Sequence, residues 1–186
     1  MTAATPVASE LVLGGQRSGK SRRAEALAEA WLAADAGRQA CFIVTAEPGD
    51  GEMRDRIERH RADRAERLPR AATVEAPRAL AGAIAAQGDA GRLLVVDCLT
   101  LWLANLHPLD AAGIAAETGR LAAAVAAAPG PVVLVSNEIG LGVVPLGREV
   151  RAYVDALGRL NQALAAVCER VTLVAAGLPL ALKGSL

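Results

Sequence analysis

The chain has few aromatic residues and few lysines, and it carries no net charge. Phe, Trp and Tyr together make up 2% of the 186 residues, although 53% of the residues are hydrophobic. The core must therefore be built mainly from aliphatic side chains. The 20 basic residues balance 20 acidic ones, which argues against a polyelectrolyte partner. We therefore expect neither nucleic-acid binding nor attachment to a charged membrane surface.

Cysteine is also scarce, and the sequence lacks the long apolar run of a membrane span. Cys41, Cys98 and Cys168 are far apart, odd in number, and lie in or beside apolar segments. This pattern is typical of buried, reduced thiols in a cytoplasmic protein and not of a disulfide framework or a metal site. No apolar run approaches the roughly 20 residues that cross a bilayer. Residues 1–9 lack a basic segment and a long apolar core, so we interpret them as a disordered or frayed terminus, not as a signal peptide.

Short apolar runs alternate with helical patterns over residues 10–186, which predicts a single α/β domain. Strands are expected at 10–13, 40–45, 92–97, 131–135 and 171–175, with a weaker candidate near 72–75. Helices are expected at 20–36, 51–67, 77–88, 111–128 and 147–169. One face of the last helix carries Val150, Val154, Leu157, Asn161 and Leu164. Uninterrupted aliphatic strands between helices indicate a mostly parallel sheet with helices on both faces.

The most informative segment follows the first strand. Residues 14–21 read Gly-Gly-Gln-Arg-Ser-Gly-Lys-Ser and fit G-x-x-x-x-G-K-[ST], the phosphate-binding P-loop. Glycines let the backbone N–H groups approach phosphate oxygens, and the Ser21 hydroxyl can ligate Mg²⁺. An apolar strand before the motif and an amphipathic helix after it supply the required context. The segment predicts a nucleoside triphosphate site; the alternative is a glycine-rich turn without a ligand.

Lysine is almost absent outside this motif. Only Lys20 and Lys183, among 20 basic residues, are lysines. The compact ammonium of Lys20 suits contact with the β- and γ-phosphates better than a planar guanidinium does. We expect Lys20 to lie in a surface loop where its charge serves only the phosphates.

Polar residues also follow the other strands, and in an open α/β sheet ligands bind at the carboxyl ends of strands. Thr45 ends the second strand, Asp97 ends the 92–97 strand, and Glu138 follows the 131–135 strand. Asp97 has the position of a Walker B acid that holds Mg²⁺; alternatively, it caps the helical segment that follows. Glu138 either contacts the site or belongs to a plain surface loop.

The helix expected over 51–67 is highly charged, and its ordinary interpretation is a solvated surface helix with i,i+4 ion pairs. One stripe of it nevertheless contains Met53, Ile57, His60 and Arg64. His60 should therefore face inward, with Arg61 and Arg64 beside it. A neutral imidazole is a nucleophile near neutral pH, and guanidiniums neutralise a phosphoryl group under attack. His60 is thus a candidate for catalysis or phosphate contact; a structural histidine is the alternative.

Five segments, taken in order, carry a resemblance to a known family. They are residues 14–21, Arg56–Arg61, Thr73–Glu75, Ser136–Pro145 (Ser-Asn-Glu-Ile-Gly-Leu-Gly-Val-Val-Pro) and Gly158–Gln162 (Gly-Arg-Leu-Asn-Gln). From about residue 10 onward the chain resembles the bifunctional adenosylcobinamide kinase/adenosylcobinamide-phosphate guanylyltransferase family of cobalamin biosynthesis. The resemblance implies a RecA-like P-loop NTPase fold, a homotrimer and two reactions.

The first implied reaction phosphorylates adenosylcobinamide with ATP or GTP. The second transfers GMP from GTP to the new phosphate through a covalent adduct on His60. The resemblance makes His60 the guanylylated, catalytic histidine. The motifs make Lys20 catalytic and make Ser21 and Asp97 the candidate Mg²⁺ ligands. The implied nucleotide-binding residues are Gly14, Gly15, Gln16, Arg17, Ser18, Gly19, Lys20, Ser21, Val44, Thr45, Ala46, Arg61, Ala62, Asp63, Arg64, Glu75 and Asp97.

Two other functions are compatible with the motifs alone. A small-molecule P-loop kinase with a single activity would need no inward-facing histidine and would form no guanylylated protein. A nucleotide-dependent switch protein would hold or hydrolyse nucleotide without modifying a corrinoid.

Overall fold

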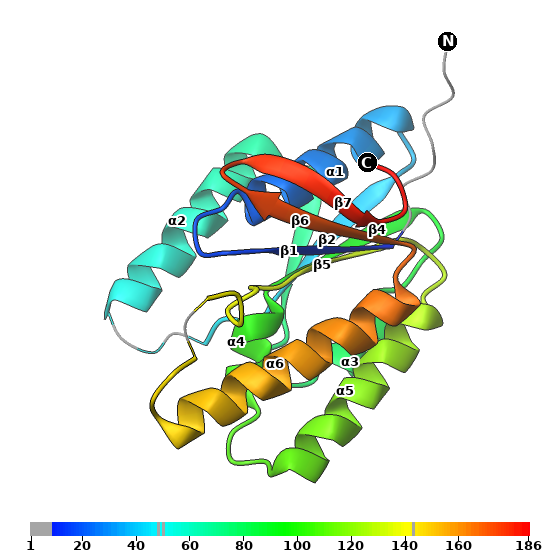
Figure 1. Cartoon of the computed structure of the whole chain (residues 1–186). Coiled ribbons are helices and arrows are strands. Elements are labelled where there is room, and N and C mark those ends of the chain that lie inside the picture. The colour runs from blue at the N-terminus through cyan, green and yellow to red at the C-terminus, as the bar shows by residue number, and fades with distance from the viewer. Residues whose placement is uncertain (1–8, 48, 50, 143) are drawn as a thin grey trace.

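A computed structural model describes residues 9–47, 49, 51–142 and 144–186, except for the side chains of residues 52, 53, 55–57, 59, 60 and 63. The strands are β1 (Glu10–Gly14), β2 (Gln39–Val44), β3 (Ala71–Glu75), β4 (Arg92–Asp97), β5 (Val132–Val135), β6 (Arg170–Ala175) and β7 (Leu178–Lys183). The helices are α1 (Lys20–Ala34), α2 (Gly51–Arg67), α3 (Leu80–Gln87), α4 (Leu99–Asn105), α5 (Ala111–Ala126) and α6 (Arg148–Val167). Figure 1 shows their arrangement.

Within this part of the chain the strands form one sheet in the order β3-β2-β4-β5-β1-β6-β7. Strands β1 to β6 pair in parallel, and β7 pairs antiparallel with β6. The mostly parallel sheet is therefore confirmed, including the weaker strand candidate near 72–75. Because the six parallel strands share one direction, their carboxyl ends meet at one edge of the sheet.

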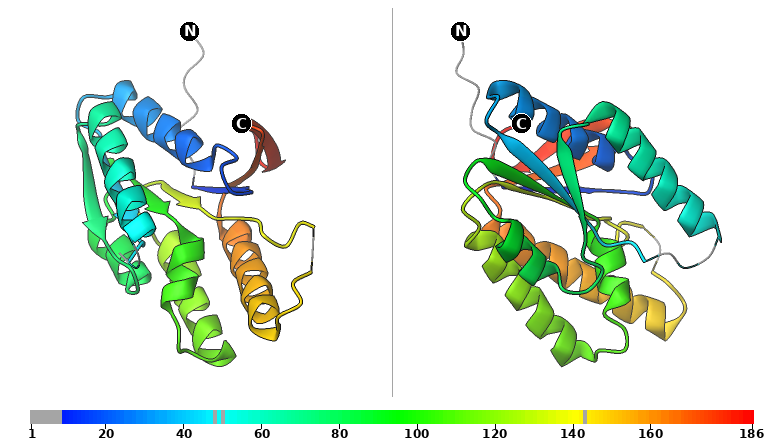
Figure 2. Two further views of the ribbon diagram at one scale, coloured as in Figure 1. Left: turned by 90° about the vertical axis from the view of Figure 1, so that its left-hand side faces the viewer. Right: turned by 180° about the vertical axis from the view of Figure 1, so that it is seen from behind.

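Helices cover both faces of the sheet, as predicted. Helices α1 and α2 lie on one face, and α3 to α6 lie on the other (Figures 1 and 2). Alternate residues of the central strands pack into the two layers: Val12 packs with α1, whereas Leu11 and Leu13 pack toward α3 to α6. This double burial explains why the strands are continuously aliphatic. The few aromatic residues reinforce the same core, because Trp31, Phe42 and Trp102 are buried.

The sequence pattern missed two elements and misplaced one residue. Helix α4 directly follows β4, where a helical segment was considered only as the alternative for Asp97, and β7 follows β6 after only two residues. In α6, Leu157, Asn161 and Leu164 are buried as expected, but Val150 is 53% exposed. The first turn of α6 therefore extends beyond the core that the rest of the helix covers.

The remaining expectations concern the cysteines, the membrane and the N-terminus. Cys41 and Cys168 are buried, Cys98 is partly buried, and all three are free thiols. No helix in the described residues is long and apolar enough to cross a membrane. Residues 1–8 of the predicted frayed terminus lie outside the described residues. The carbonyl of Ser9 accepts a hydrogen bond from the Arg170 N–H, which joins this residue to the sheet.

Candidate nucleotide site

The P-loop, residues 14–21, connects the central strand β1 to α1, and its shape depends on two glycines. Gly14 and Gly19 have φ values of 154° and 107°, which side chains rarely allow. A Cβ on Gly14 would lie 2.3 Å from the carbonyl oxygen of Val174, and one on Gly19 would lie 3.3 Å from Cα of Gly177. The loop thus packs directly against the β6–β7 hairpin, and its glycines are required for that close approach.

Lys20 differs from the sequence-based expectation. It is the first residue of α1 and only 8% exposed, so its predicted position in a surface loop is wrong. Its Nζ donates a hydrogen bond of 2.6 Å to the carbonyl oxygen of Gly15. Side chains of a helix point toward its N-terminus, which brings the ammonium back over the P-loop. Lys20 therefore contributes to the structure of the loop, and its contact with phosphates stays a prediction.

The end of β4 brings Asp97 to the same edge of the sheet. Asp97 is in register with Val44 of β2 and Val135 of β5. The N-cap residue of α4 is Cys98, so the alternative in which Asp97 caps that helix is wrong. The peptide bond between Asp97 and Cys98 is cis.

Thr45, which directly follows β2, binds the main chain at the end of β4. It is fully buried. Its hydroxyl donates to the carbonyl oxygen of Cys98 at 2.7 Å and accepts from the Cys98 N–H at 3.0 Å. Asn105 of α4 donates to the Thr45 carbonyl at 2.7 Å. Thr45 therefore fixes the ends of β2 and β4 relative to each other, and its direct contact with nucleotide stays a prediction.

Helix α2 carries arginines that face this edge. Nη2 of Arg61 lies 2.7 Å from Oε1 of Glu75 at the end of β3, and both side chains are exposed. Arg64 is buried, and its guanidinium carbon lies 4.6 Å from the centre of the Phe42 ring. Burial lowers the pKa of Arg64, and the negative charges of Asp97 and Glu25 oppose that shift. The structure thus brings Arg64 within electrostatic reach of Asp97.

The other predicted site residues have less defined surroundings. His60 and Asp63 belong to α2, but their side chains lie outside the described residues, so the inward orientation of His60 stays a prediction. Gln16, Arg17 and Ala62 are exposed, whereas Ser18, Ser21, Val44 and Ala46 are partly buried. None of these observations tests a nucleotide contact.

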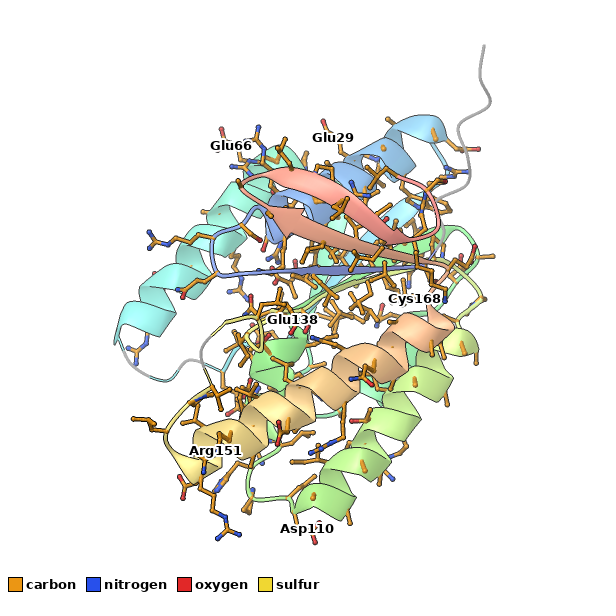
Figure 3. The ribbon with its side chains drawn as sticks, viewed as in Figure 1. Glu29, Glu66, Asp110, Glu138, Arg151 and Cys168 are labelled. Atoms are coloured by element: carbon orange, nitrogen blue, oxygen red, sulfur yellow. The ribbon has the colours of Figure 1, made fainter. Side chains whose placement is uncertain are left out.

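A polar network holds the segment after β5 against the P-loop. The Glu138 N–H donates to the Gly14 carbonyl at 3.0 Å, which joins this partly exposed loop to the P-loop; a contact of Glu138 with nucleotide or substrate stays a prediction. Ser136 Oγ donates to Asn161 Oδ1 at 2.7 Å, and Asn161 Nδ2 reaches the Asn137 carbonyl at 3.2 Å and Glu138 Oε2 at 3.5 Å. Figure 3 shows Glu138 between the sheet and α6. The sequence pattern placed Asn161 only on the apolar face of the last helix and missed its hydrogen bonds to Ser136, Asn137 and Glu138. A polar amide among apolar residues was the signal that could have indicated them.

The acidic residues at this edge do not form a ready-made metal cage. The described residues contain no group of three or more His, Cys, Asp or Glu side chains that could hold a metal ion. Mg²⁺ typically binds through one or two carboxylates and completes its shell with water and substrate phosphates. The role of Asp97 and Ser21 in such a site, where the metal ion would arrive with the nucleotide, stays a prediction.

The fold and the loop define a P-loop nucleotide-binding protein of the RecA-like class. The chain superposes on the RadB recombinase with a TM-score of 0.50 and 18% identity, over 90% of this chain and 74% of that one. It superposes on the KaiC-like protein PH0186 of Pyrococcus horikoshii OT3 with a TM-score of 0.53 and 16% identity, over 90% and 71%. At these identities the similarity concerns the fold alone.

The sequence relatives narrow this class to one family. The chain belongs to the cobinamide kinase/cobinamide phosphate guanyltransferase family, whose model matches residues 10–182. It is 51% identical to the bifunctional adenosylcobalamin biosynthesis protein CobP of Pseudomonas aeruginosa, over 94% of this chain and 97% of that protein. It is 37% identical to the bifunctional adenosylcobalamin biosynthesis protein CobU of Escherichia coli K12, over 93% and 98%.

Proposed function

We propose that this chain phosphorylates adenosylcobinamide with ATP or GTP and then transfers GMP from GTP to the resulting phosphate, which gives adenosylcobinamide-GDP. The observation that carries the proposal is membership of the family over residues 10–182. The P-loop between β1 and α1 supports it, because both reactions begin with a nucleoside triphosphate.

The kinase reaction requires positioning and charge neutralisation more than covalent chemistry. The substrate hydroxyl attacks the γ-phosphorus, and the nucleoside diphosphate leaves. Lys20 and the P-loop N–H groups stabilise the phosphate oxygens, and Asp97 and Ser21 are the residues that would hold Mg²⁺. When bound, Mg²⁺ neutralises charge on the phosphates. Glu138, held by Asn161, is the candidate to orient the substrate hydroxyl and accept its proton.

The transferase reaction uses His60 as a nucleophile. Its imidazole nitrogen attacks the α-phosphorus of GTP, a P–N bond forms, and pyrophosphate leaves. A phosphate oxygen of adenosylcobinamide phosphate then attacks the same phosphorus, and the P–N bond breaks. Covalent catalysis divides one difficult displacement into two easier ones. The buried charge of Arg64, one turn from His60 in α2, supports this role because it would stabilise the phosphoryl group under attack.

Labelling with radioactive GTP tests the covalent step. The enzyme should retain label from α-labelled but not from γ-labelled GTP, and the adduct should be acid-labile and alkali-stable, as for a phosphoramidate. Below a pH of about 6, adduct formation should slow because protonated imidazole lacks the nucleophilic lone pair.

The variant His60→Ala supplies the control. It should form no adduct but keep substantial kinase activity, since the kinase reaction depends on Lys20 and the bound metal ion. A folded His60→Ala protein that is still labelled, or that loses both activities equally, would contradict the covalent role. A wild-type enzyme with kinase activity but no adduct would favour the single-activity kinase, and one that only hydrolyses nucleotide would favour a switch protein.

We further propose that the chain works as a homotrimer in the cytoplasm. Leu178, Leu180 and Leu182, an exposed row of leucines on the edge strand β7, support the assembly. The three free thiols support a reducing compartment, since disulfides are rare in the cytoplasm.

A further inference from the structure

A cavity beside the P-loop lies on the side of β1 that the proposed reactions leave unassigned. It has a volume of about 460 Å³ and lies between α1 and the β6–β7 hairpin. Asp97 and Glu75 belong to strands on the opposite side of β1. A volume of this size is within the range of small-molecule sites, roughly 300–1,000 Å³.

The cavity is joined rigidly to the phosphate-binding loop. Arg17 and Ser18 of the P-loop form part of its lining. The Gly177 N–H of the hairpin turn donates to the Ser18 carbonyl at 2.9 Å, and Gly19 packs closely on Gly177. A ligand whose phosphates occupy the P-loop would therefore find the cavity at a fixed place beside them.

The walls of the cavity combine apolar and basic side chains. Leu27, Val174 and Pro179 give an apolar surface, which suits a flat heterocyclic ring. Arg17 and Arg22 are exposed at the same cavity, and guanidiniums stack on aromatic rings and pair with phosphates. Apolar walls with adjacent guanidiniums suit a nucleoside attached to phosphates.

We propose that this cavity holds the base and ribose of the phosphoryl donor in the kinase reaction. The inference rests on the proposed function, because it concerns the donor of that reaction. The GTP that guanylylates His60 extends to the other side of β1, toward α2 and Glu75. One P-loop thus serves two nucleotides whose nucleosides lie on opposite sides of the central strand.

The lining also predicts how selective the donor site is. The described residues that line the cavity include no Asp, Glu, Asn or Gln. Guanine presents neighbouring N–H donors at N1 and N2, to which a carboxylate can bind. The cavity offers no side-chain carboxylate or amide for these donors. On the transferase side, Glu75 supplies a carboxylate. The donor site therefore discriminates weakly between ATP and GTP.

A pair of tryptophan substitutions tests the location of the donor. Ala26 lines the cavity and is exposed, so Ala26→Trp fills the cavity without disturbing the core. Ala33 is also exposed in α1, and about 10 Å further along the helix, so Ala33→Trp is the matched control. We expect calorimetric titration with ADP to give a Kd at least about tenfold weaker for Ala26→Trp and about equal to wild type for Ala33→Trp. Pro179→Trp, which fills the cavity from β7, should repeat the effect.

Two enzymatic measurements complete the test. Ala26→Trp should raise the kinase KM for ATP in parallel with the ADP Kd, while adduct formation from α-labelled GTP changes much less. In a His60→Ala background, where GTP is not consumed by guanylylation, kinase kcat/KM for ATP and for GTP should agree within about tenfold.

Wild-type ADP affinity in folded Ala26→Trp and Pro179→Trp proteins would overturn the proposal. Equal loss of ADP binding and of adduct formation would overturn the separation of the two nucleosides, and a strong preference for one donor would overturn the weak discrimination. Because titration with ADP requires neither His60 nor a corrinoid, it tests the cavity even if wild-type protein forms no adduct and the proposed function fails.

Discussion

Both lysines of this chain bind main-chain carbonyl groups. Nζ of Lys20 donates to Gly15 in the P-loop. Nζ of Lys183 donates to the carbonyls of Ala165, Ala166 and Cys168 at 2.9, 3.2 and 2.6 Å, where α6 ends and its last carbonyls lack helical partners. A compact ammonium with three donors serves such converging carbonyls better than a planar guanidinium does. This explains why an otherwise arginine-rich chain has lysine at these two positions.

Asp97→Asn separates a role in metal binding from a role in structure. Asn keeps the size of the side chain but removes the charge, so we expect the kinase kcat to fall by at least about tenfold, with a smaller change in nucleotide affinity. Loss of the charge near Arg64 should also lower the melting temperature slightly. The measurements are the Mg²⁺ dependence of the kinase rate and thermal unfolding. Asp89→Asn, in the exposed turn before β4, is the control, and an Asp97→Asn enzyme with normal rate and Mg²⁺ dependence would exclude the metal role.

Cys168 should make stability depend on pH in the alkaline range. Burial raises the pKa of its thiol from 9.0 to about 12. Between these pH values the thiol ionises in the unfolded chain but stays protonated in the folded one, so the free energy of unfolding falls as pH rises. The slope for one group approaches about 1.4 kcal/mol per pH unit. Urea unfolding of wild type and Cys168→Ala from pH 8 to 11 should show a stability difference that shrinks with pH. A constant difference would contradict this account.

At the scale of elements, the β6–β7 hairpin connects the P-loop to the edge of the sheet through a strained turn. Ala176 and Gly177 have φ values of 52° and 79°, the two positive values of a type I′ turn. Alanine is disfavoured there, whereas asparagine followed by glycine is the preferred pair. Ala176→Asn should therefore stabilise the protein, by a part of the roughly 1–2 kcal/mol that the left-handed conformation costs an ordinary L-residue. Thermal unfolding measures this gain in stability. The control is Ala175→Asn, at the exposed end of β6. An Ala176→Asn protein that is no more stable than this control would refute the turn assignment.

The sequence predicts most reliably the elements whose pattern reflects burial on both sides. Strands β1, β2, β4 and β5 are continuously apolar and buried between their ends because helices cover both faces of the sheet there. Helix α1 follows the P-loop with its apolar stripe buried at Ala24, Ala28 and Trp31. Strand β7 could not be predicted in this way. Its leucines are exposed and it contains Pro179, which only an edge strand accommodates. Its position depends on a two-residue turn that pairs an alanine with a glycine.

The candidate site is predictable at its motif but not in its supporting contacts. The P-loop motif, Asp97 and Glu138 can be found because strand ends share one edge of the sheet. The burial of Lys20, the Cys98 cap of α4 and the link from Asn161 to Glu138 cannot, since each depends on how two elements pack in three dimensions. Thr45 shows the same limit: its hydroxyl binds the Cys98 main chain, which no local pattern indicates.

At the scale of the whole molecule, one edge of the sheet is apolar and exposed. Leu178, Leu180 and Leu182 alternate along β7 and are 72%, 58% and 55% exposed. A monomer with such an edge strand would be prone to non-specific pairing, and apolar surface patches usually mark sites of association. We therefore expect this leucine row to lie in the interface of the proposed homotrimer.

Leu180→Glu tests this interface. Light scattering should give wild-type protein the mass of three chains and Leu180→Glu the mass of one, because a carboxylate buried without a partner in an apolar contact is strongly unfavourable. Leu109→Glu, at an exposed leucine between α4 and α5, should leave the mass unchanged. A monomeric wild type would contradict the trimer, and a trimeric Leu180→Glu protein would place the interface elsewhere.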